Sequence, residues 1–312
     1  MYVVKHLIFW KILLPLLILV VARVILLVRR YRHFCPLRSG SVVLITGAGR
    51  GIGLEFAHFF SRAGCYVVLV GRDVEGLRAA QASCLEAGAA GTEVIVADLS
   101  TAEGTDRVVL ELQQLLTTLS LEKEFRYLVL NAGHGAVVPF SPLPTFIDVC
   151  RKVMEINYFA NVRLLQQLLP LLEGCHSTEC PSRVIAVSSL AGVLPSTLRT
   201  PYAASKHALQ GFVNTLRGET AVHITLCCPG YVDTDFHRKA HLMDEHVVHH
   251  PSPRRGISPA ACVQVCMDGA LHSDPEVIMT LTGKLGYILR PVFTRLVDAR
   301  AKKVSLDSLQ GQ

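Results

Sequence analysis

The fold of this 312-residue chain is decided by one stretch, Thr46-Gly47-Ala48-Gly49-Arg50-Gly51-Ile52-Gly53. The stretch follows an apolar, β-branched run at residues 42–45 and leads into an amphipathic run at residues 52–62. Glycine is needed where a chain turns sharply, where the backbone approaches a phosphate, and where a helix packs closely on a strand. A helix N-terminus adds N–H groups and a positive dipole that attract phosphates. This strand, turn and helix together predict a dinucleotide site.

Short apolar runs recur along the rest of the chain, separated by longer helical patterns such as residues 145–172. They predict further strands at residues 66–70, 93–97, 126–130, 183–187, 223–227 and 276–279. Nearly continuous apolar strands that alternate with helices indicate a parallel sheet covered on both faces. We therefore expect an α/β fold, a doubly wound parallel sheet of the Rossmann type in a single domain.

An apolar segment precedes this domain at residues 7–28, interrupted only by Lys11, Pro15 and Arg23. As a helix it would be about 33 Å long, enough to cross a bilayer core. A cleaved signal peptide is the alternative, but the apolar run continues past Ala22, where a signal peptide would end. We therefore expect an N-terminal transmembrane helix that serves as a membrane anchor.

Basic residues follow the anchor more densely than they precede it. The cluster consists of Arg29, Arg30, Arg32, His33 and Arg38. The positive-inside rule then places the domain that follows in the cytosol. The net charge of +6 is not accompanied by base-reading or stacking groups, which argues against nucleic-acid binding. The ten cysteines show no zinc-type spacing, so we expect no metal site.

These features divide the chain into five parts. We expect an N-terminal tail at 1–6, the anchor at 7–28, a basic linker at 29–40, the Rossmann-type domain at 41–280 and a C-terminal apolar and basic helical extension at 281–312. The apolar stretch at 281–297 carries Lys284, Arg290 and Arg295, too much charge for a second membrane span. It predicts a helix that lies on a protein or membrane surface.

The end of the second strand indicates which dinucleotide binds. Sites that select NAD place an acidic residue there for the ribose 2′-hydroxyl, whereas this chain has Gly71 and Arg72 after Val70. The guanidinium groups of Arg72 and of Arg50 in the glycine turn can both pair with a 2′-phosphate. Two simply exposed arginines are the alternative. The pattern favours NADP(H) as cofactor.

Acid–base chemistry is suggested by Tyr202 and Lys206, which lie four residues apart at the start of a predicted helix and so share one face. An adjacent ammonium would lower the pKa of the phenol and make Tyr202 a useful general acid or base. Ser189 stands thirteen residues before Tyr202, just after the apolar run at 183–187. Ligands bind beyond the carboxyl ends of such strands. Its neighbour Ser188 competes with Ser189 for the same role.

The ordered motifs resemble those of the classical short-chain dehydrogenase/reductase family over about residues 41–280. They are T-G-x-x-x-G-x-G, N-A-G, the serine before Y-x-x-x-K, and P-G-x-x-x-T. The resemblance implies that Tyr202 is the proton donor, that Lys206 holds the nicotinamide ribose, that Ser189 polarises the substrate carbonyl, and that Asn157 positions a water linked to the lysine. One departure is Leu130, where many members carry the first asparagine of N-N-A-G.

The resemblance also implies a full set of binding residues. The cofactor set is Thr46, Gly47, Gly49, Arg50, Gly51, Ile52, Gly53, Arg72, Asp98, Leu99, Asn131, Ala132, Gly133, Tyr202, Lys206, Pro229, Gly230, Val232 and Thr234. The substrate set is Ser189, Tyr202 and Phe236. The segment after Thr234 corresponds to a substrate lid, and its histidines are expected to be solvated and not metal ligands: His237, His241, His246, His249 and His250.

Three segments look like the membrane-anchored dehydrogenase/reductase member 7 and 7B group: residues 153–159, 202–208 and 229–232. That resemblance implies an enzyme of the endoplasmic-reticulum or peroxisomal membrane, present as a homodimer or homotetramer. It would reduce a lipophilic ketone, such as an acyl-dihydroxyacetone phosphate, a steroid or a retinoid, to an alcohol. An NAD-dependent lipid-alcohol dehydrogenase and a non-catalytic NADPH-binding membrane scaffold are the alternatives.

Overall fold

The computed structural model describes residues 34–140, 142–236 and 256–310, and before them residues 17, 18, 20, 21, 23–25, 28, 30 and 31. Its centre is a seven-stranded parallel sheet in the order β3-β2-β1-β4-β5-β6-β7. The strands are β1 Val42–Thr46, β2 Tyr66–Gly71, β3 Gly91–Val96, β4 Phe125–Leu130, β5 Arg183–Val187, β6 His223–Cys228 and β7 Glu276–Ile278. Each predicted strand is confirmed to within two residues at either end.

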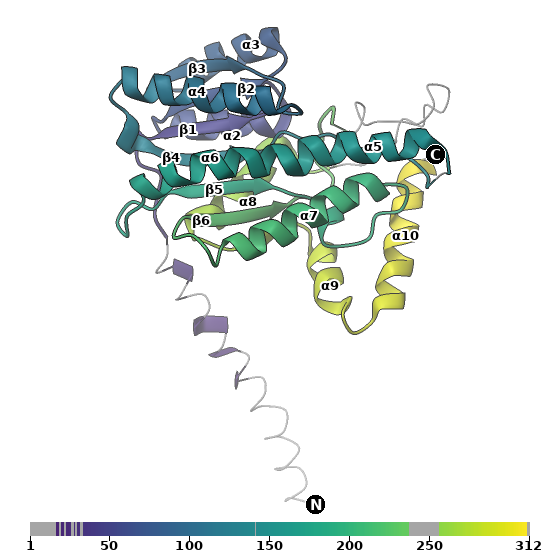
Figure 1. The fold of residues 1–312 in the computed structure, drawn as a ribbon. Helices are drawn as coiled ribbons and strands as arrows, with labels where there is room; N and C mark the ends of the chain where they lie inside the picture. Colours follow the sequence, from purple (N-terminus) through teal and green to yellow (C-terminus); the bar gives the residue numbers. More distant parts are fainter. Residues whose placement is uncertain are drawn as a thin grey trace, which may run out of the picture.

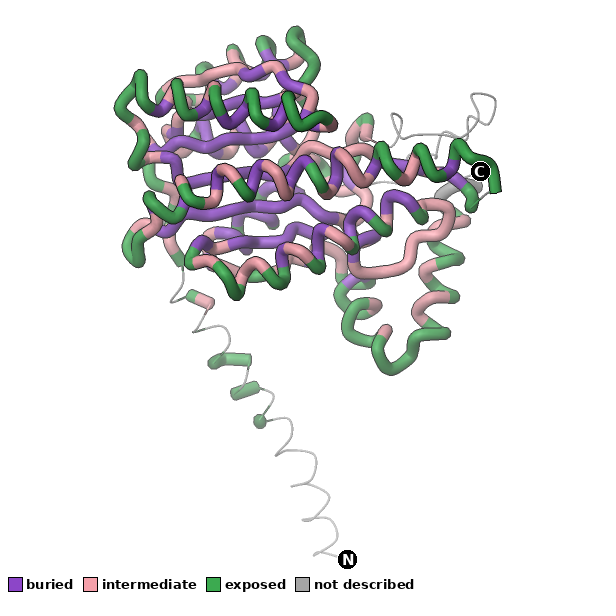
Figure 2. The backbone as a smooth tube through the Cα atoms, in the orientation of Figure 1, coloured by how far each residue is buried: buried purple, intermediate pink, exposed green. Residues whose placement is uncertain are grey.

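Helices cover both faces of this sheet, as the predicted doubly wound fold requires (Figure 1). One face carries α2 Gly51–Arg62, α3 Val74–Glu86 and α8 Pro259–Leu271. The other carries α4 Ala102–Thr118, α6 Ala160–Cys175 and α7 Thr200–Leu216. Successive side chains of a strand point to opposite faces, so Val42 and Leu44 join one apolar core and Val43 and Ile45 the other. The buried strands lie between helices whose outer faces are exposed (Figure 2).

The glycine turn joins β1 to α2 in a conformation that side chains would obstruct. Gly47 and Gly51 have φ angles of 67° and 57°, in the left-handed region that favours glycine. A Cβ atom on Gly53 would lie 2.1 Å from the carbonyl oxygen of Gly47. Arg50 precedes the helix without a side-chain capping bond. The first turn of α2 therefore packs directly on the end of β1.

One helical prediction is confirmed and one needs correction. The pattern at 145–172 is helical throughout, as α5 Pro144–Met154 and α6 joined through a π-helical turn at Glu155–Phe159. The single helix predicted at 281–297 is wrong: the chain forms α9 Leu281–Leu289 and α10 Thr294–Gln310. Pro291 explains the break, because proline lacks an N–H group and its ring clashes with the preceding helical turn.

The predicted anchor at residues 7–28 lies largely outside the described residues. Within the part of the chain that the structure describes, no helix is both long and apolar enough to cross a membrane. The described residues around Arg30 contact the domain, since its guanidinium pairs with Asp268 and, at 2.9 Å, with Asp274.

The contact at Gly53 gives a first testable prediction. Gly53→Ala should lower the free energy of unfolding by about 3 kcal/mol, because the added methyl group would overlap the Gly47 carbonyl. Gly174→Ala is the matched control: Gly174 lies in α6 with open space around it, so alanine should be neutral or stabilise by up to about 1 kcal/mol. Urea unfolding followed by circular dichroism measures both. Equal midpoints for the two variants would contradict this packing.

Candidate active site

Thr46 and Asn131 fasten the carboxyl end of β1 to that of β4. The hydroxyl of Thr46 accepts the backbone N–H groups of Asn131 at 2.9 Å and Ala132 at 3.0 Å, and donates to the carbonyl of Val129 at 3.2 Å. The side-chain amide of Asn131 donates to the carbonyl oxygens of Thr46 and Gly47, at 3.0 and 3.2 Å. Both residues belong to the predicted cofactor set. Their hydrogen bonds fix the shape of the glycine turn.

Asn157 lies in the π-helical turn and is buried. Its side-chain oxygen accepts the N–H of His134 at 2.8 Å, and its amide donates to the carbonyl of His134 and to the hydroxyl of Ser205, both at 2.9 Å. Ser205 in turn donates to the carbonyl of Tyr202 at 2.7 Å. Asn157 therefore links the loop after β4 to the first two turns of α7.

Tyr202 and Lys206 are both buried on the inner face of α7. The Lys206 ammonium donates to the carbonyl of Val187, at the end of β5, over 2.9 Å, and lies 5.9 Å from the centroid of the Tyr202 ring. Burial lowers the pKa of Lys206 to about 8, because the charged form is poorly solvated there. The ammonium therefore loses its proton at a lower pH than an ordinary lysine does.

The expectation that Lys206 lowers the pKa of Tyr202 is wrong for this structure. Burial raises the pKa of the phenol above its ordinary value. Hydrogen bonding by Ser189 and the positive charge of Arg199 lower the pKa of Tyr202, but by less than burial raises it. At neutral pH Tyr202 is therefore a protonated phenol.

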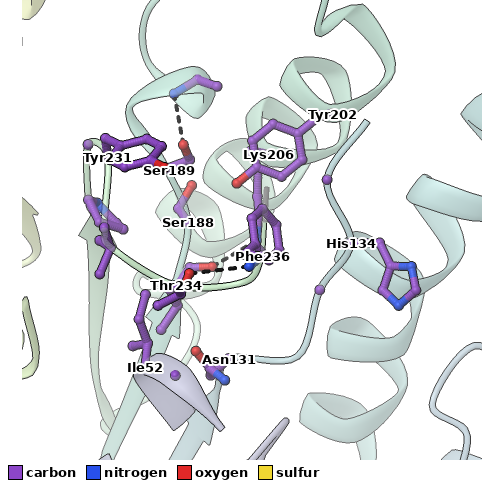
Figure 3. A pocket seen from close by; sticks show the side chains of 18 of the residues that line it. Ile52, Asn131, His134, Ser188, Ser189, Tyr202, Lys206, Tyr231, Thr234 and Phe236 are labelled. Carbon is purple, nitrogen blue, oxygen red and sulfur yellow. Dashed lines mark hydrogen bonds between the residues drawn. The ribbon is translucent and has the colours of Figure 1, made fainter. Parts of the chain in front are cut away.

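Ser188 and Ser189 both line the cavity, and of the two it is Ser189 that lowers the pKa of Tyr202. The Ser189 hydroxyl also accepts the N–H of Ala191 at 3.1 Å. Ser188 is buried, and its hydroxyl has no hydrogen-bond partner among the described residues. Figure 3 shows Ser189, Tyr202 and Lys206 around one cavity, with the ring of Phe236 beside that of Tyr202. The centroids of these two rings are 5.9 Å apart.

Arg72 stands at the end of β2 with its guanidinium between two partners. It donates to Nε2 of His134 at 2.9 Å and lies 3.6 Å from a carboxylate oxygen of Asp98. Burial alone would raise the pKa of the Asp98 carboxyl. Hydrogen bonds from Ser100 and the positive charge of Arg72 outweigh that effect, so the pKa of Asp98 is lowered. Arg72 and Asp98 are both substantially exposed, so their pair contributes at most about 1 kcal/mol. Arg72 remains able to exchange these partners for an anionic ligand.

These groups surround a cavity of about 710 Å³ at the carboxyl edge of the sheet. The predicted site residues that line it are Gly47, Arg50, Gly51, Ile52, Arg72, Asn131, Ala132, Gly133, Ser189, Tyr202, Lys206, Pro229, Gly230, Val232, Thr234 and Phe236. The predicted residues behind this lining are Thr46, Gly49, Gly53, Asp98, Leu99 and Asn157. Leu99 is buried in the core beside α4, and Asp98 meets the site through Arg72.

The sequence prediction missed several residues of the cavity wall, of which Arg199 is the most informative. Leu198 before it has a φ angle of 62°, an uncommon value for a leucine, and its carbonyl accepts the N–H of Val138 at 2.8 Å. Spacing alone could have found Arg199, because it precedes Tyr202 by three residues at the start of α7. Tyr231 and Val304 also line the cavity, and no sequence motif pointed to them.

The described residues on the two sides of the predicted lid pair with each other through their backbones. Val232 and Ile257 form a parallel bridge, supported by bonds of 3.0 Å from Asp233 to Ile257 and 3.2 Å from Ile257 to Tyr231. The lid histidines lie outside the described residues: His237, His241, His246, His249 and His250.

This fold and these side chains define a dinucleotide-binding α/β protein with an acid–base group at the carboxyl edge of its sheet. The sequence model of the short chain dehydrogenase family matches residues 41–245. The chain therefore belongs to the short chain dehydrogenase family and is an oxidoreductase of that family.

Two curated relatives illustrate this similarity. The chain is 31% identical over 277 residues to "Dehydrogenase/reductase SDR family protein 7-like" of Dictyostelium discoideum, covering 87% of this chain and 84% of the relative. It is 39% identical over 202 residues to "Hydroxysteroid 11-beta-dehydrogenase 1-like protein" of Gallus gallus, covering 63% of this chain and 66% of that protein. The resemblance to the member 7 and 7B group is thus confirmed.

Solved structures share the fold. A metagenomic short-chain oxidoreductase in complex with NADP is 28% identical, with a TM-score of 0.59 and coverage of 78% of this chain and 97% of the other. A short chain dehydrogenase/reductase from Burkholderia phymatum in complex with NAD is 20% identical, with a TM-score of 0.69 and coverage of 83% and 95%.

Proposed function

We propose that this protein is an NADPH-dependent reductase that converts a carbonyl on a lipophilic substrate to an alcohol, with Tyr202 as proton donor. The observation that carries the proposal is that Ser189 and the buried phenol of Tyr202 line one cavity, which begins at the glycine turn. A serine and a phenol on the same side of a carbonyl oxygen can polarise it and then protonate it.

The glycine turn fits a dinucleotide because side chains are missing where phosphates would lie. A Cβ atom added to Gly51 would lie 3.3 Å from the methyl group of Thr234, and both residues line the cavity. The N-terminus of α2 behind it favours an anion. Arg50 and Arg72 both line the cavity and support NADP(H), as does the NADP in the metagenomic relative. Bound here, the cofactor would supply the hydride.

The protonation states of the side chains support the direction of reduction. A proton donor must hold its proton until the carbonyl oxygen gains negative charge, and burial keeps the phenol of Tyr202 protonated. The positive charge of Arg199 stabilises the phenolate left behind. Lys206 is buried one turn further along α7. Its ammonium faces Gly133, where an added Cβ atom would lie 3.6 Å from the nitrogen.

The wall of the cavity supports a lipophilic substrate. Phe236, Tyr231, Leu190 and Val304 contribute apolar surface to it. The apolar segment at residues 7–28 supports a single-pass membrane protein, and we infer an endoplasmic-reticulum or peroxisomal membrane with the domain in the cytosol. The Gallus gallus relative is named as a hydroxysteroid dehydrogenase-like protein, which favours testing ketosteroids beside retinoids and acyl-dihydroxyacetone phosphate.

Removing the hydroxyl of Tyr202 tests the proton donor. Tyr202→Phe should lower kcat for ketone reduction by about 100-fold or more, because general acid catalysis is lost while the ring stays in place. NADPH oxidation by the detergent-solubilised full chain with a panel of lipid ketones measures it. Tyr66→Phe on β2, away from the cavity, is the matched control and should keep full activity. Unchanged turnover in Tyr202→Phe would remove Tyr202 from the mechanism.

The low pKa of Lys206 predicts a pH dependence. Below about 8 the buried ammonium is charged, and above that value it loses its proton, well before an ordinary lysine would. The value of kcat/KM for reduction should therefore be level near neutral pH and fall above about 8, tending toward tenfold per pH unit. A profile that stays level to pH 10 would show that the charge of Lys206 is not used.

Charge reversal at Arg72 tests the choice of cofactor. Arg72→Asp should raise KM for NADPH by about 10- to 100-fold, because a charge-assisted bond to the 2′-phosphate is worth about 1.5–3 kcal/mol. KM for NADH should change little. Arg78→Asp, exposed on α3 outside the cavity, controls for net charge. An unchanged preference in Arg72→Asp would favour the NAD-dependent alcohol dehydrogenase instead.

A further inference from the structure

The helix α9 is held on the domain by its smallest residues. A Cβ atom on Gly283 would lie 2.7 Å from a side-chain carbon of Leu190, and one on Gly286 would lie 3.0 Å from a side-chain carbon of Leu194. These two leucines belong to the segment that follows Ser189. The glycine face of α9 therefore packs inward, close against the rim of the cavity.

The large apolar side chains of α9 point the other way. Leu281, Leu285 and Ile288 are exposed at a spacing of four and three residues, which places them on one helix face. The exposed apolar surface continues through the turn after α9, where Val292 is 74% exposed, and into α10, where Leu296 is 71% exposed. A helix on a soluble surface turns its apolar face inward, so this arrangement is inverted.

Side-chain hydrogen bonds cross the connection between the two helices. The Arg290 guanidinium binds both carboxylate oxygens of Asp298, at 2.8 and 3.4 Å. The hydroxyl of Thr294 donates to the carbonyl of Arg290 at 2.8 Å. The apolar tip, defined as Ile288, Val292, Phe293 and Leu296, therefore lies where these side-chain bonds join the two helices of the hairpin.

Positive charge around the tip favours an anionic lipid surface over a second copy of the hairpin as its partner. Residues 281–310 contain six lysine and arginine residues against two aspartates, and Lys284, Arg295 and Arg300 are exposed close to the tip in sequence. Two copies of the hairpin placed face to face would bring these cations together. An anionic lipid surface would instead attract them, by about 1 kcal/mol for each residue near the headgroups.

The hairpin also projects in a suitable direction. In Figure 1 it extends beyond the β6 side of the sheet, and the described residues of the N-terminal segment extend beyond the same side. Leu17, Ile18 and Val24 in that segment are exposed apolar residues as well. Figure 2 shows both projections as largely exposed.

We propose that the apolar tip of the α9–α10 hairpin inserts into the headgroup and acyl boundary of an anionic lipid bilayer. The tip is a second membrane contact of the domain, distinct from the N-terminal segment. Because Val304 and Ser305 of α10 line the cavity, and Ser305 accepts the N–H of Thr197 at 3.3 Å, the docked hairpin holds the cavity close to the lipid. This contact is independent of the reaction in the cavity.

Depth-dependent fluorescence quenching tests the proposal on the full chain. Trp10 is the single tryptophan, so Trp10→Phe provides a background without signal. Phe293→Trp in that background is reconstituted in phosphatidylserine-containing vesicles with brominated acyl chains. Its tryptophan fluorescence should be about threefold weaker there than in the same vesicles without bromine. Leu110→Trp, exposed on α4, is the matched control and should show no such difference. Replacing phosphatidylserine by phosphatidylcholine should weaken the quenching.

Val292→Trp is the second reporter, and circular dichroism confirms that each variant is folded. Quenching no greater at Phe293→Trp and Val292→Trp than at Leu110→Trp would overturn the proposal. A blue-shifted emission that depends on protein concentration and not on bromine would overturn it as well, because a second copy of the chain would then cover the tip. Loss of ketone reduction with quenching intact would leave the docking surface standing and remove only the proposed reaction.

Discussion

The hydrogen bond from the buried ammonium of Lys206 to the carbonyl of Val187 joins α7 to the end of β5, and the candidate active site depends on this junction. Ser189 follows Val187 by two residues, and Tyr202 precedes Lys206 by one helical turn. Fixing Val187 against Lys206 therefore fixes the serine against the phenol. Burying the ammonium is costly: a pKa near 8 in place of 10.5 corresponds to about 3 kcal/mol. Such costs are typical of functional sites.

Much of the fold could be predicted from the sequence, because parallel strands buried on both faces read as short apolar runs. The runs at 42–45 and 183–187 became β1 and β5, and the glycine turn formed where the strand–turn–helix pattern placed it. Spacing could also place Tyr202 and Lys206 on one helix face. It could not give the balance of their pKa values, because that balance depends on burial and on Arg199, which only the folded chain reveals.

In the C-terminal extension, the sequence could predict helical structure but not where the helix breaks or which of its faces packs inward. Its apolar run was long enough to predict a helix, but Pro291 divides it and turns the chain back toward the cavity. The two glycines of α9 then decide which face packs inward, since only small residues fit against Leu190 and Leu194. A periodicity argument would have buried the leucine face. The contacts instead leave that face outward, next to a wall of the site.

The central claim, that this cavity delivers hydride to a lipid carbonyl, is tested most directly by isotope transfer. The full chain is incubated with a membrane lipid extract and NADPH that carries deuterium at C4 of the nicotinamide, and the lipids are examined by mass spectrometry. The account predicts a lipid alcohol with deuterium on its carbinol carbon in the wild type. Lipids free of deuterium, under conditions where the protein binds NADPH, would contradict it.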